Sequence, residues 1–318
     1  MSSREQFLLN PVKKETYGDI GKDNPDVLLL CPHDADSKKF LKVYPEIVEP
    51  YQDNPQVLDD FFQLERDIGS YQLALQTAKE LIKISRAKLR IDLLYVAEIP
   101  RAVIDANRVP HEDESVTNPS GVHISPIRKV FDHATHPELV KEFHAIHRSM
   151  IKKIRTALKS LLPDGVFFDV HCMNDHDPLK TDTAIKEGPS PKQLEEYIRR
   201  LTLAEFQGRK RSVNILTRFV DQPIIANEIL VGNLESALNN SGITTERDHP
   251  YSYLDFSMCS HYALENPNKG TTVDFPIREI SEDGQADNVS PKLDNSKIKT
   301  IARINAESIY YTIPIVKN

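Results

Sequence analysis

The stretch Val27-Leu28-Leu29-Leu30-Cys31-Pro32-His33 carries the first clear fold signal of the chain. Five successive apolar residues predict a central strand that is buried on both faces. Residues 93–97 and 166–170 have the same character, and His171 directly follows the second of these runs. We therefore predict a sheet with His33 and His171 at the carboxyl ends of two strands, the edge where ligands bind in open α/β sheets.

Helical segments separate these strands. Residues 70–85 and 137–162 place apolar side chains at intervals of three and four, which is the pattern of an amphipathic helix. We expect a further strand over 270–275 and helices over 223–238 and 296–316. Strands that alternate with helices predict an α/β fold with three layers, a mixed and mostly parallel sheet flanked by helices.

The length of 318 residues is compatible with one α/β unit, and no linker separates two domains. We predict a single catalytic domain over 1–318. The Pro- and Gly-containing segment 175–212 is predicted to be a surface insertion with a short helix over 191–206. Residues 1–25 lack a clear period and indicate an edge strand with a loop, or a loose arm.

Charge and composition exclude several classes of partner. The chain has 40 basic and 47 acidic residues and a net charge of −7, so it lacks the basic footprint of a nucleic-acid-binding protein. Its apolar runs are too short to cross a membrane, and its first residues lack the apolar core of a signal peptide. Three cysteines suit a reducing compartment. We expect a cytoplasmic protein and leave its oligomeric state open.

The residues at the predicted strand ends suggest a metal site. A hydrolytic zinc site takes three protein ligands, usually His and carboxylate, and leaves one position for water. His33, His171 and a carboxylate from Glu65 or Asp67 would supply such a set, although no short metal motif such as His-Glu-x-x-His occurs.

Several segments resemble the N-formylglutamate amidohydrolase (deformylase) family, which shares its fold and metal-site plan with zinc carboxypeptidases and aspartoacylases. The similarity is clear over about residues 27–173 and faint beyond, and the Ile-Asp-x-Asn-Arg segment is its most specific part. The matching segments, in the family's order, are Leu29–His33, Arg66–Gly69, Pro100–Arg108 and Phe168–Met173, with weaker matches at Phe143–His147 and Thr272–Pro276.

The resemblance implies a zinc-carboxypeptidase-like fold and one Zn²⁺ per chain, held by His33, Asp67 and His171. Glu65 is the substitute for the carboxylate ligand, because it lies two residues before Asp67 and would share a side with it on an extended segment. Asp36 is a second rival, since His33-x-x-Asp36 resembles the His-x-x-Glu pair of carboxypeptidases.

The resemblance also implies residues that bind a small carboxylate substrate. Arg108, with Asn107 beside it, would grip a substrate carboxylate, a task that suits the planar guanidinium of arginine. Arg101 would clamp a second anionic group or pair with Asp105. His147 is the histidine of the 137–162 helix that we expect to face the site.

A hydrolase of this plan needs a carboxylate base that moves a proton from water to the leaving nitrogen. Asp274 has the apolar flanks of the family's glutamate but is one methylene shorter, and Glu279 is the alternative. The chain also has Asp34 where the family has a small residue, so we expect a narrower pocket or repulsion of an anionic substrate. Cys172 stands where the family has serine, and we expect it to be inert.

Three functions follow from these residues. The first is a zinc-dependent amidohydrolase that cleaves the linear amide of a small N-acyl, N-formyl-like amino acid. The second is a non-catalytic relative that binds a carboxylate ligand. The third is a metallopeptidase that acts on a peptide or a cell-wall fragment, with the segment 175–212 shaping a longer groove.

Overall fold

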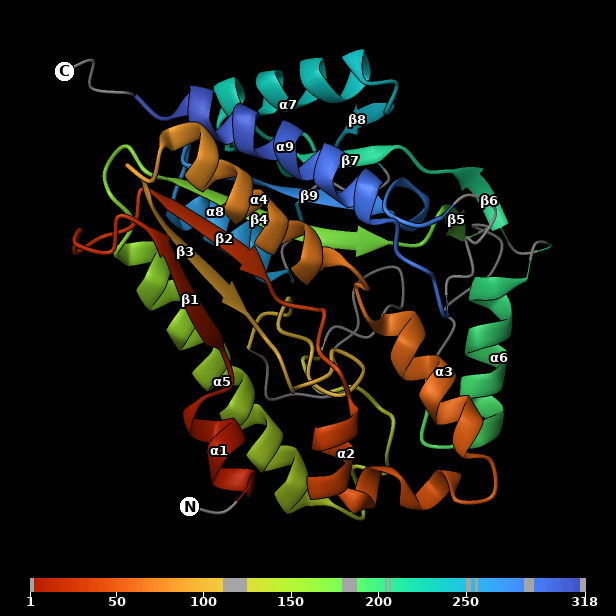
Figure 1. Ribbon diagram of the computed structural model, residues 1–318. Coiled ribbons are helices and arrows are strands. Elements are labelled where there is room, and N and C mark those ends of the chain that lie inside the picture. The colour runs from red at the N-terminus through yellow and green to blue at the C-terminus, as the bar shows by residue number, and fades with distance from the viewer. Residues whose placement is uncertain are drawn as a thin grey trace.

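The computed structural model describes residues 3–110, 125–178, 188–203, 205, 207–249, 253–254, 257–282 and 289–314. Its central feature is a seven-stranded mixed sheet (Figure 1). The four middle strands are parallel, β1 runs antiparallel at one edge, and β7 and β8 are parallel to each other and antiparallel to β9. In spatial order the strands are β1 (Lys13–Gly18), β3 (Arg90–Tyr95), β2 (Val27–Cys31), β4 (Val166–Met173), β9 (Gly270–Pro276), β7 (Val213–Leu216) and β8 (Thr245–Arg247).

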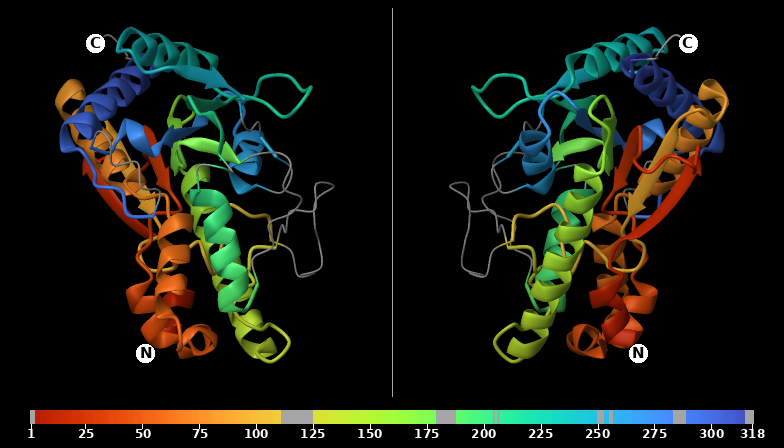
Figure 2. Two further views of the ribbon diagram at one scale, coloured as in Figure 1. Left: turned by 90° about the vertical axis from the view of Figure 1, so that its right-hand side faces the viewer. Right: turned by 90° about the vertical axis from the view of Figure 1, so that its left-hand side faces the viewer.

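Helices cover both faces of this sheet, as Figure 2 shows from two sides. On one face α4 (Ser70–Ser85) packs against α9 (Asn295–Thr312), and α7 (Glu228–Asn240) packs against α9 in turn. On the other face lie α5 (Pro137–Lys159) and α8 (Met258–Glu265). Two apolar cores fill the spaces between the layers. The predicted three-layer α/β arrangement is therefore confirmed.

Strand β4 determines which face carries the polar site. Successive side chains of a strand point to opposite faces. Val166, Phe168 and Val170 enter the core beneath α4, α7 and α9, whereas Phe167 enters the core beneath α5. Asp169 and His171 alternate with the first set, so they project toward the α5 and α8 layer.

Element boundaries follow local capping. The strand over 27–31 and the helix over 70–85 match their predictions residue for residue. Helix α7 begins five residues later than predicted, at Glu228, because the side chain of Asn227 accepts a hydrogen bond from the Leu230 amide and caps the helix there. Helices α5 and α9 end at Lys159 and Thr312, before the predicted 162 and 316.

The structure adds elements that the sequence pattern did not reveal. The N-terminal region forms α1 (Ser3–Leu9) before the edge strand β1. Between β2 and α4 lie α2 (Lys38–Val43), the short 3-10 turns η1 (Pro45–Ile47) and η2 (Glu49–Tyr51), and α3 (Pro55–Glu65). A further 3-10 turn, η4 (Ile277–Glu279), follows β9.

The described residues of the segment 175–212, which are 175–178, 188–203, 205 and 207–212, include two strands and a helix. Strands β5 (His176–Pro178) and β6 (Gln207–Lys210) make an antiparallel pair, and α6 (Pro191–Thr202) between them packs on α3. The predicted helix over 191–206 is thus shorter than expected, ending at Thr202. No helix in the described ranges combines the length and the apolar character that a membrane span needs.

Candidate metal centre

Three segments that are distant in sequence bring His33, Asp67 and His171 together. His33 lies in the loop after β2, His171 lies in β4, and Asp67 lies in the turn between α3 and α4. One possible ligand atom from each residue lies within 4.8 Å of the other two, and all three side chains are buried. The amide of Asp67 donates a hydrogen bond of 3.1 Å to the carbonyl of His33, which fixes the two loops relative to each other.

The ligand atoms converge on one point. Asp67 Oδ2 lies 2.9 Å from His171 Nδ1 and 3.4 Å from His33 Nδ1. The two imidazole rings are 4.9 Å apart and stand at 67° to each other. Both nitrogens of His33 are buried without hydrogen-bond geometry to any group in the described part of the chain. Two imidazole nitrogens and one carboxylate oxygen that converge in this way fit a divalent metal ion such as Zn²⁺.

A second carboxylate stands behind each imidazole. Asp105 Oδ1 lies 3.0 Å from His33 Nε2, and Asp169 Oδ2 lies 3.2 Å from His171 Nε2. In metal sites such an outer carboxylate fixes the ring orientation and its tautomer. Neither role was predicted from the sequence. The Asp169-x-His171 spacing, which places both side chains on one face of a strand, could have indicated the role of Asp169.

The ionisable groups of the site shift each other's pKa values. Burial alone would raise the pKa of Asp67, but His33, His171 and Arg101 outweigh burial and lower it. Burial would lower the pKa of His171, yet Asp169 and Asp67 raise it well above its ordinary value. The carboxylate of the site is therefore ionised at neutral pH, as a metal ligand must be.

Three arginines surround the buried carboxylate of Asp105. Arg101 Nη1 lies 3.1 Å from Asp67 Oδ1, and Arg101 Nε lies 3.5 Å from Asp105 Oδ2. Arg108 and Arg128 lie 3.5 and 3.9 Å from the same Asp105 oxygen. Arg101 thus contacts Asp105, which the sequence analysis gives as a possible partner, and it also contacts Asp67.

The other two predicted substrate residues lie in this neighbourhood. Asn107 Oδ1 accepts a 2.8 Å hydrogen bond from the Cys259 amide, which attaches this loop to α8. His147 is fully buried on α5, and burial lowers its pKa to about 4, so its ring is neutral at pH 7. Substrate binding by Asn107, Arg108, Arg101 and His147 stays a prediction.

The two candidate bases occupy different surroundings. Asp274 on β9 is the register partner of His171 on β4, so both side chains project from the same face. Burial raises the pKa of Asp274, while His171 and Arg211 act in the opposite direction. Glu279 lies in η4, where its carboxylate is 3.1 Å from Arg278 Nε. Asp274 is thus the acid adjacent to a candidate ligand, and its role as a base stays a prediction.

The rival ligands lie elsewhere. Glu65 is the last residue of α3, so it does not lie on an extended segment with Asp67 as expected. Its carboxylate lies 3.1 Å from Arg128 and accepts a hydrogen bond from Tyr197. Asp36 is exposed and accepts a 2.7 Å hydrogen bond from the amide of Lys38. Neither residue belongs to the group that could hold a metal.

Asp34, which we expected to narrow the pocket or repel an anionic substrate, takes part in hydrogen bonds that hold the loop after β2 to the start of α4. Its carboxylate accepts hydrogen bonds from Arg66 Nε at 2.7 Å and from the amides of Gly69 and Tyr71 at 3.1 and 3.0 Å. These contacts bind it to the start of α4, and both of its oxygens are engaged there. Cys172 belongs to the core on the opposite sheet face from His171, and burial raises its pKa well above the ordinary value, consistent with an inert thiol.

Comparison with known proteins shows the fold. No protein-family model matches the chain, and no curated protein matches it. Among solved structures, an N-formylglutamate amidohydrolase from Ralstonia eutropha is similar with a TM-score of 0.54 and 12% identity, over 95% of this chain and 97% of that one. A protein from Agrobacterium tumefaciens is similar with a TM-score of 0.51 and 15% identity, over 97% and 96% of the two chains. The predicted fold class is therefore confirmed.

Proposed function

We propose that this protein is a zinc-dependent hydrolase that cleaves the amide of a small N-acyl amino acid. The observation that carries the proposal is the convergence of His33, Asp67 and His171 at the carboxyl ends of the central strands. A structural neighbour with the same fold is named as an N-formylglutamate amidohydrolase, which supports the choice of substrate class. Bound Zn²⁺ would polarise the amide carbonyl and acidify a water molecule.

The remaining chemistry belongs to side chains of this chain. We assign Asp274 as the base that takes the proton from the attacking water and delivers it to the leaving nitrogen. Burial raises its pKa, which makes its carboxylate a stronger base than that of an exposed aspartate. Arg108, which is half-buried beside Asp105, would hold a carboxylate of the substrate through its planar guanidinium.

The charges around the site favour a bound divalent cation. Glu65, Asp67 and Asp105 are matched by Arg101, Arg108 and Arg128 through the contacts described above. Asp169 and Asp274 place two further carboxylates beside His171, and the two positive charges of a divalent cation would balance them.

The test combines metal content with turnover. Purified protein is stripped with a chelator, reloaded with Zn²⁺, and assayed against N-formylglutamate, other N-acyl amino acids and short peptides. We expect one Zn²⁺ per chain and release of the acyl group from the small acidic substrates. Saturable binding without product would instead favour the carboxylate-binding alternative, and cleavage confined to peptides would favour the metallopeptidase.

A further inference from the structure

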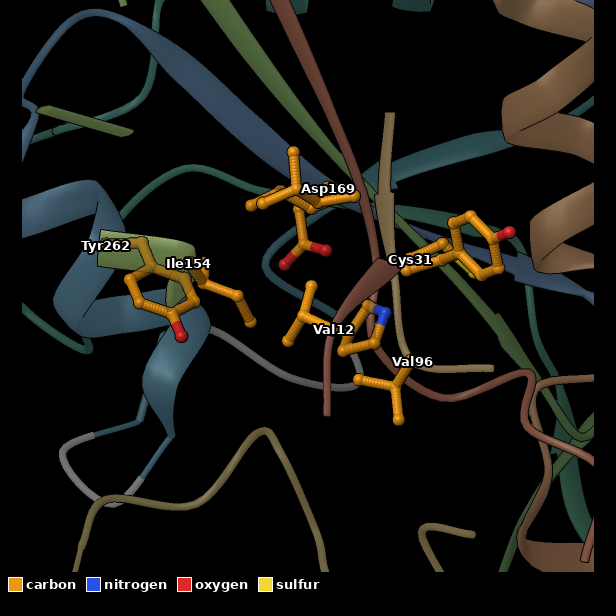
Figure 3. A pocket seen from close by; sticks show the side chains of 10 residues that line it. Val12, Cys31, Val96, Ile154, Asp169 and Tyr262 are labelled. Atoms are coloured by element: carbon orange, nitrogen blue, oxygen red, sulfur yellow. The ribbon is translucent and has the colours of Figure 1, made fainter. Parts of the chain in front are cut away.

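A small cavity lined by Asp169, the carboxylate behind His171, lies between the sheet and the α5 and α8 layer (Figure 3). Most of its wall is apolar, with side chains from β2, β3 and α5 such as Leu30, Leu94 and Ile154. Asp169 from β4, Tyr262 from α8 and Tyr95 from β3 also line it, and the hydroxyl of Tyr95 donates a 2.8 Å hydrogen bond to Glu15. In Figure 3 the carboxylate of Asp169 points into the cavity.

Asp169 and Tyr262 each have a buried polar atom without a hydrogen-bond partner in the described part of the chain. Asp169 and Tyr262 are 2% and 4% exposed. Asp169 Oδ1 and Tyr262 Oη make no hydrogen bond to any other group in the described ranges. An unsatisfied buried polar atom costs about 1–3 kcal/mol, so native proteins usually pair it with protein or with ordered water.

The two groups are close enough to influence each other. Burial raises the pKa of Tyr262, and the negative charge of Asp169 raises it further. Both effects keep the phenol protonated and therefore able to donate. The space open to the centre of a water molecule is about 10 Å³, which is close to the room for a single water.

We propose that this cavity binds one water molecule, which accepts a hydrogen bond from Tyr262 Oη and donates one to Asp169 Oδ1. Tyr262 is then a positioning residue for the metal ligand His171, an assignment that rests on the proposed metal site. Nothing in the sequence singled out Tyr262 for a role, because the contact arises from the packing of α8 against the sheet.

The other oxygen of Asp169 explains why this water matters. Asp169 Oδ2 lies 3.2 Å from His171 Nε2 and 3.4 Å from Thr272 Oγ1. A carboxylate that is also held at Oδ1 cannot rotate away from the imidazole. It therefore keeps the proton on His171 Nε2 and leaves the Nδ1 lone pair directed toward Asp67 and the metal.

The variant Tyr262→Phe tests the proposed link from Tyr262 through the water and Asp169 to His171, because it removes one hydroxyl and keeps the ring. Outer-shell partners of metal ligands are worth about 10–100-fold in metal affinity, so a group one hydrogen bond further out should weaken Zn²⁺ binding by roughly 3–10-fold. Titration of the chelator-stripped protein with Zn²⁺ against a competing indicator measures the dissociation constant. Asp169→Asn, which alters the carboxylate itself, should weaken binding by about 10–100-fold in the same assay.

Tyr51→Phe is the matched control. Tyr51 is fully buried, lies in η2 outside the segments that carry the three ligands, and donates a 2.8 Å hydrogen bond to the carbonyl of Val130. We expect this variant to lose stability without a change in Zn²⁺ affinity beyond twofold. An equal loss of affinity in both variants would show a general effect of losing a buried hydroxyl and would overturn the assignment of Tyr262.

A high-resolution crystal structure of the wild-type protein supplies a readout that needs neither metal nor the variant. We expect one ordered water within about 3.2 Å of both Tyr262 Oη and Asp169 Oδ1. A dry cavity, or Zn²⁺ affinity unchanged by Tyr262→Phe, overturns the inference. A wild-type protein that holds this water but binds no Zn²⁺ would instead refute the proposed function.

Discussion

The carboxylate of Asp105 offers a sharp test, because it is fully buried and contacts several groups of the site at once. Its oxygens lie 3.0 Å from His33 Nε2 and 3.5 Å from both Arg101 Nε and Arg108 Nη1, and Oδ1 accepts a 2.9 Å hydrogen bond from the Asn107 amide. Asp105→Asn keeps the shape of the side chain and removes its charge.

Asp105→Asn should change both the unfolding free energy and the Zn²⁺ affinity. Burial opposes the charge of Asp105, yet Arg108, Arg101 and His33 lower its pKa well below the ordinary value, so the folded protein favours the ionised form. Removing one partner of a buried ion pair typically costs 3–5 kcal/mol, and we expect a loss of unfolding free energy of about that size. His33 also loses its orienting carboxylate, which should weaken Zn²⁺ binding by about 10–100-fold.

Asp92→Asn is the matched control. Asp92 is also a buried carboxylate, 3.2 Å from both Arg90 Nε and Lys14 Nζ, but it lies on β3 at the β1 edge and contacts no candidate ligand. Urea unfolding of the metal-free proteins and Zn²⁺ titration separate the two effects. Asp92→Asn should lower stability alone. The reasoning fails if Asp105→Asn binds Zn²⁺ like the wild type, or if Asp92→Asn weakens binding equally.

Three further predictions concern the assigned roles. His171→Ala should abolish stoichiometric Zn²⁺ binding, whereas Asp36→Asn should leave it within about twofold of the wild type, as metal analysis after dialysis would show; retention by His171→Ala would contradict the ligand set. Asp274→Asn should retain Zn²⁺ but lose about 10²–10⁴-fold in kcat, whereas Glu279→Gln should stay near wild type in the same steady-state assay, and the reverse ranking would exchange the two roles. Arg108→Lys should raise KM by about 10-fold or more for acidic substrates, because an ammonium cannot grip a carboxylate at two points; an unchanged KM would remove Arg108 from the substrate site.

An element could be predicted from the sequence where its own residues, without contacts from distant segments, determine its secondary structure. Residues 27–31 are apolar throughout and form a fully buried strand, and the helix over 70–85 has a regular apolar stripe. The same strand ends placed His33 and His171 at one edge of the sheet, where the structure brings them together with Asp67.

The features that could not be predicted depend on contacts between distant segments. The direction of Asp34 depends on Arg66 and on the amides at the start of α4. The contact between Asp105 and His33 forms only when two loops meet across more than seventy residues. Helix α3 was within reach of sequence reasoning, because Asn54-Pro55 is a typical helix start and Val57, Leu58, Phe61 and Phe62 recur at helical spacing.

The backbone hydrogen bond from the Asp67 amide to the His33 carbonyl has a consequence for how an ion enters the site. It makes the oxygen donor and one of the nitrogen donors parts of a single stiff scaffold before any ion arrives. Little chain entropy then remains to be lost on capture, so uptake should leave the surrounding loops almost unchanged. Exchange of one cation for another would then be governed by bond preferences of the ions themselves, with little contribution from refolding of the polypeptide.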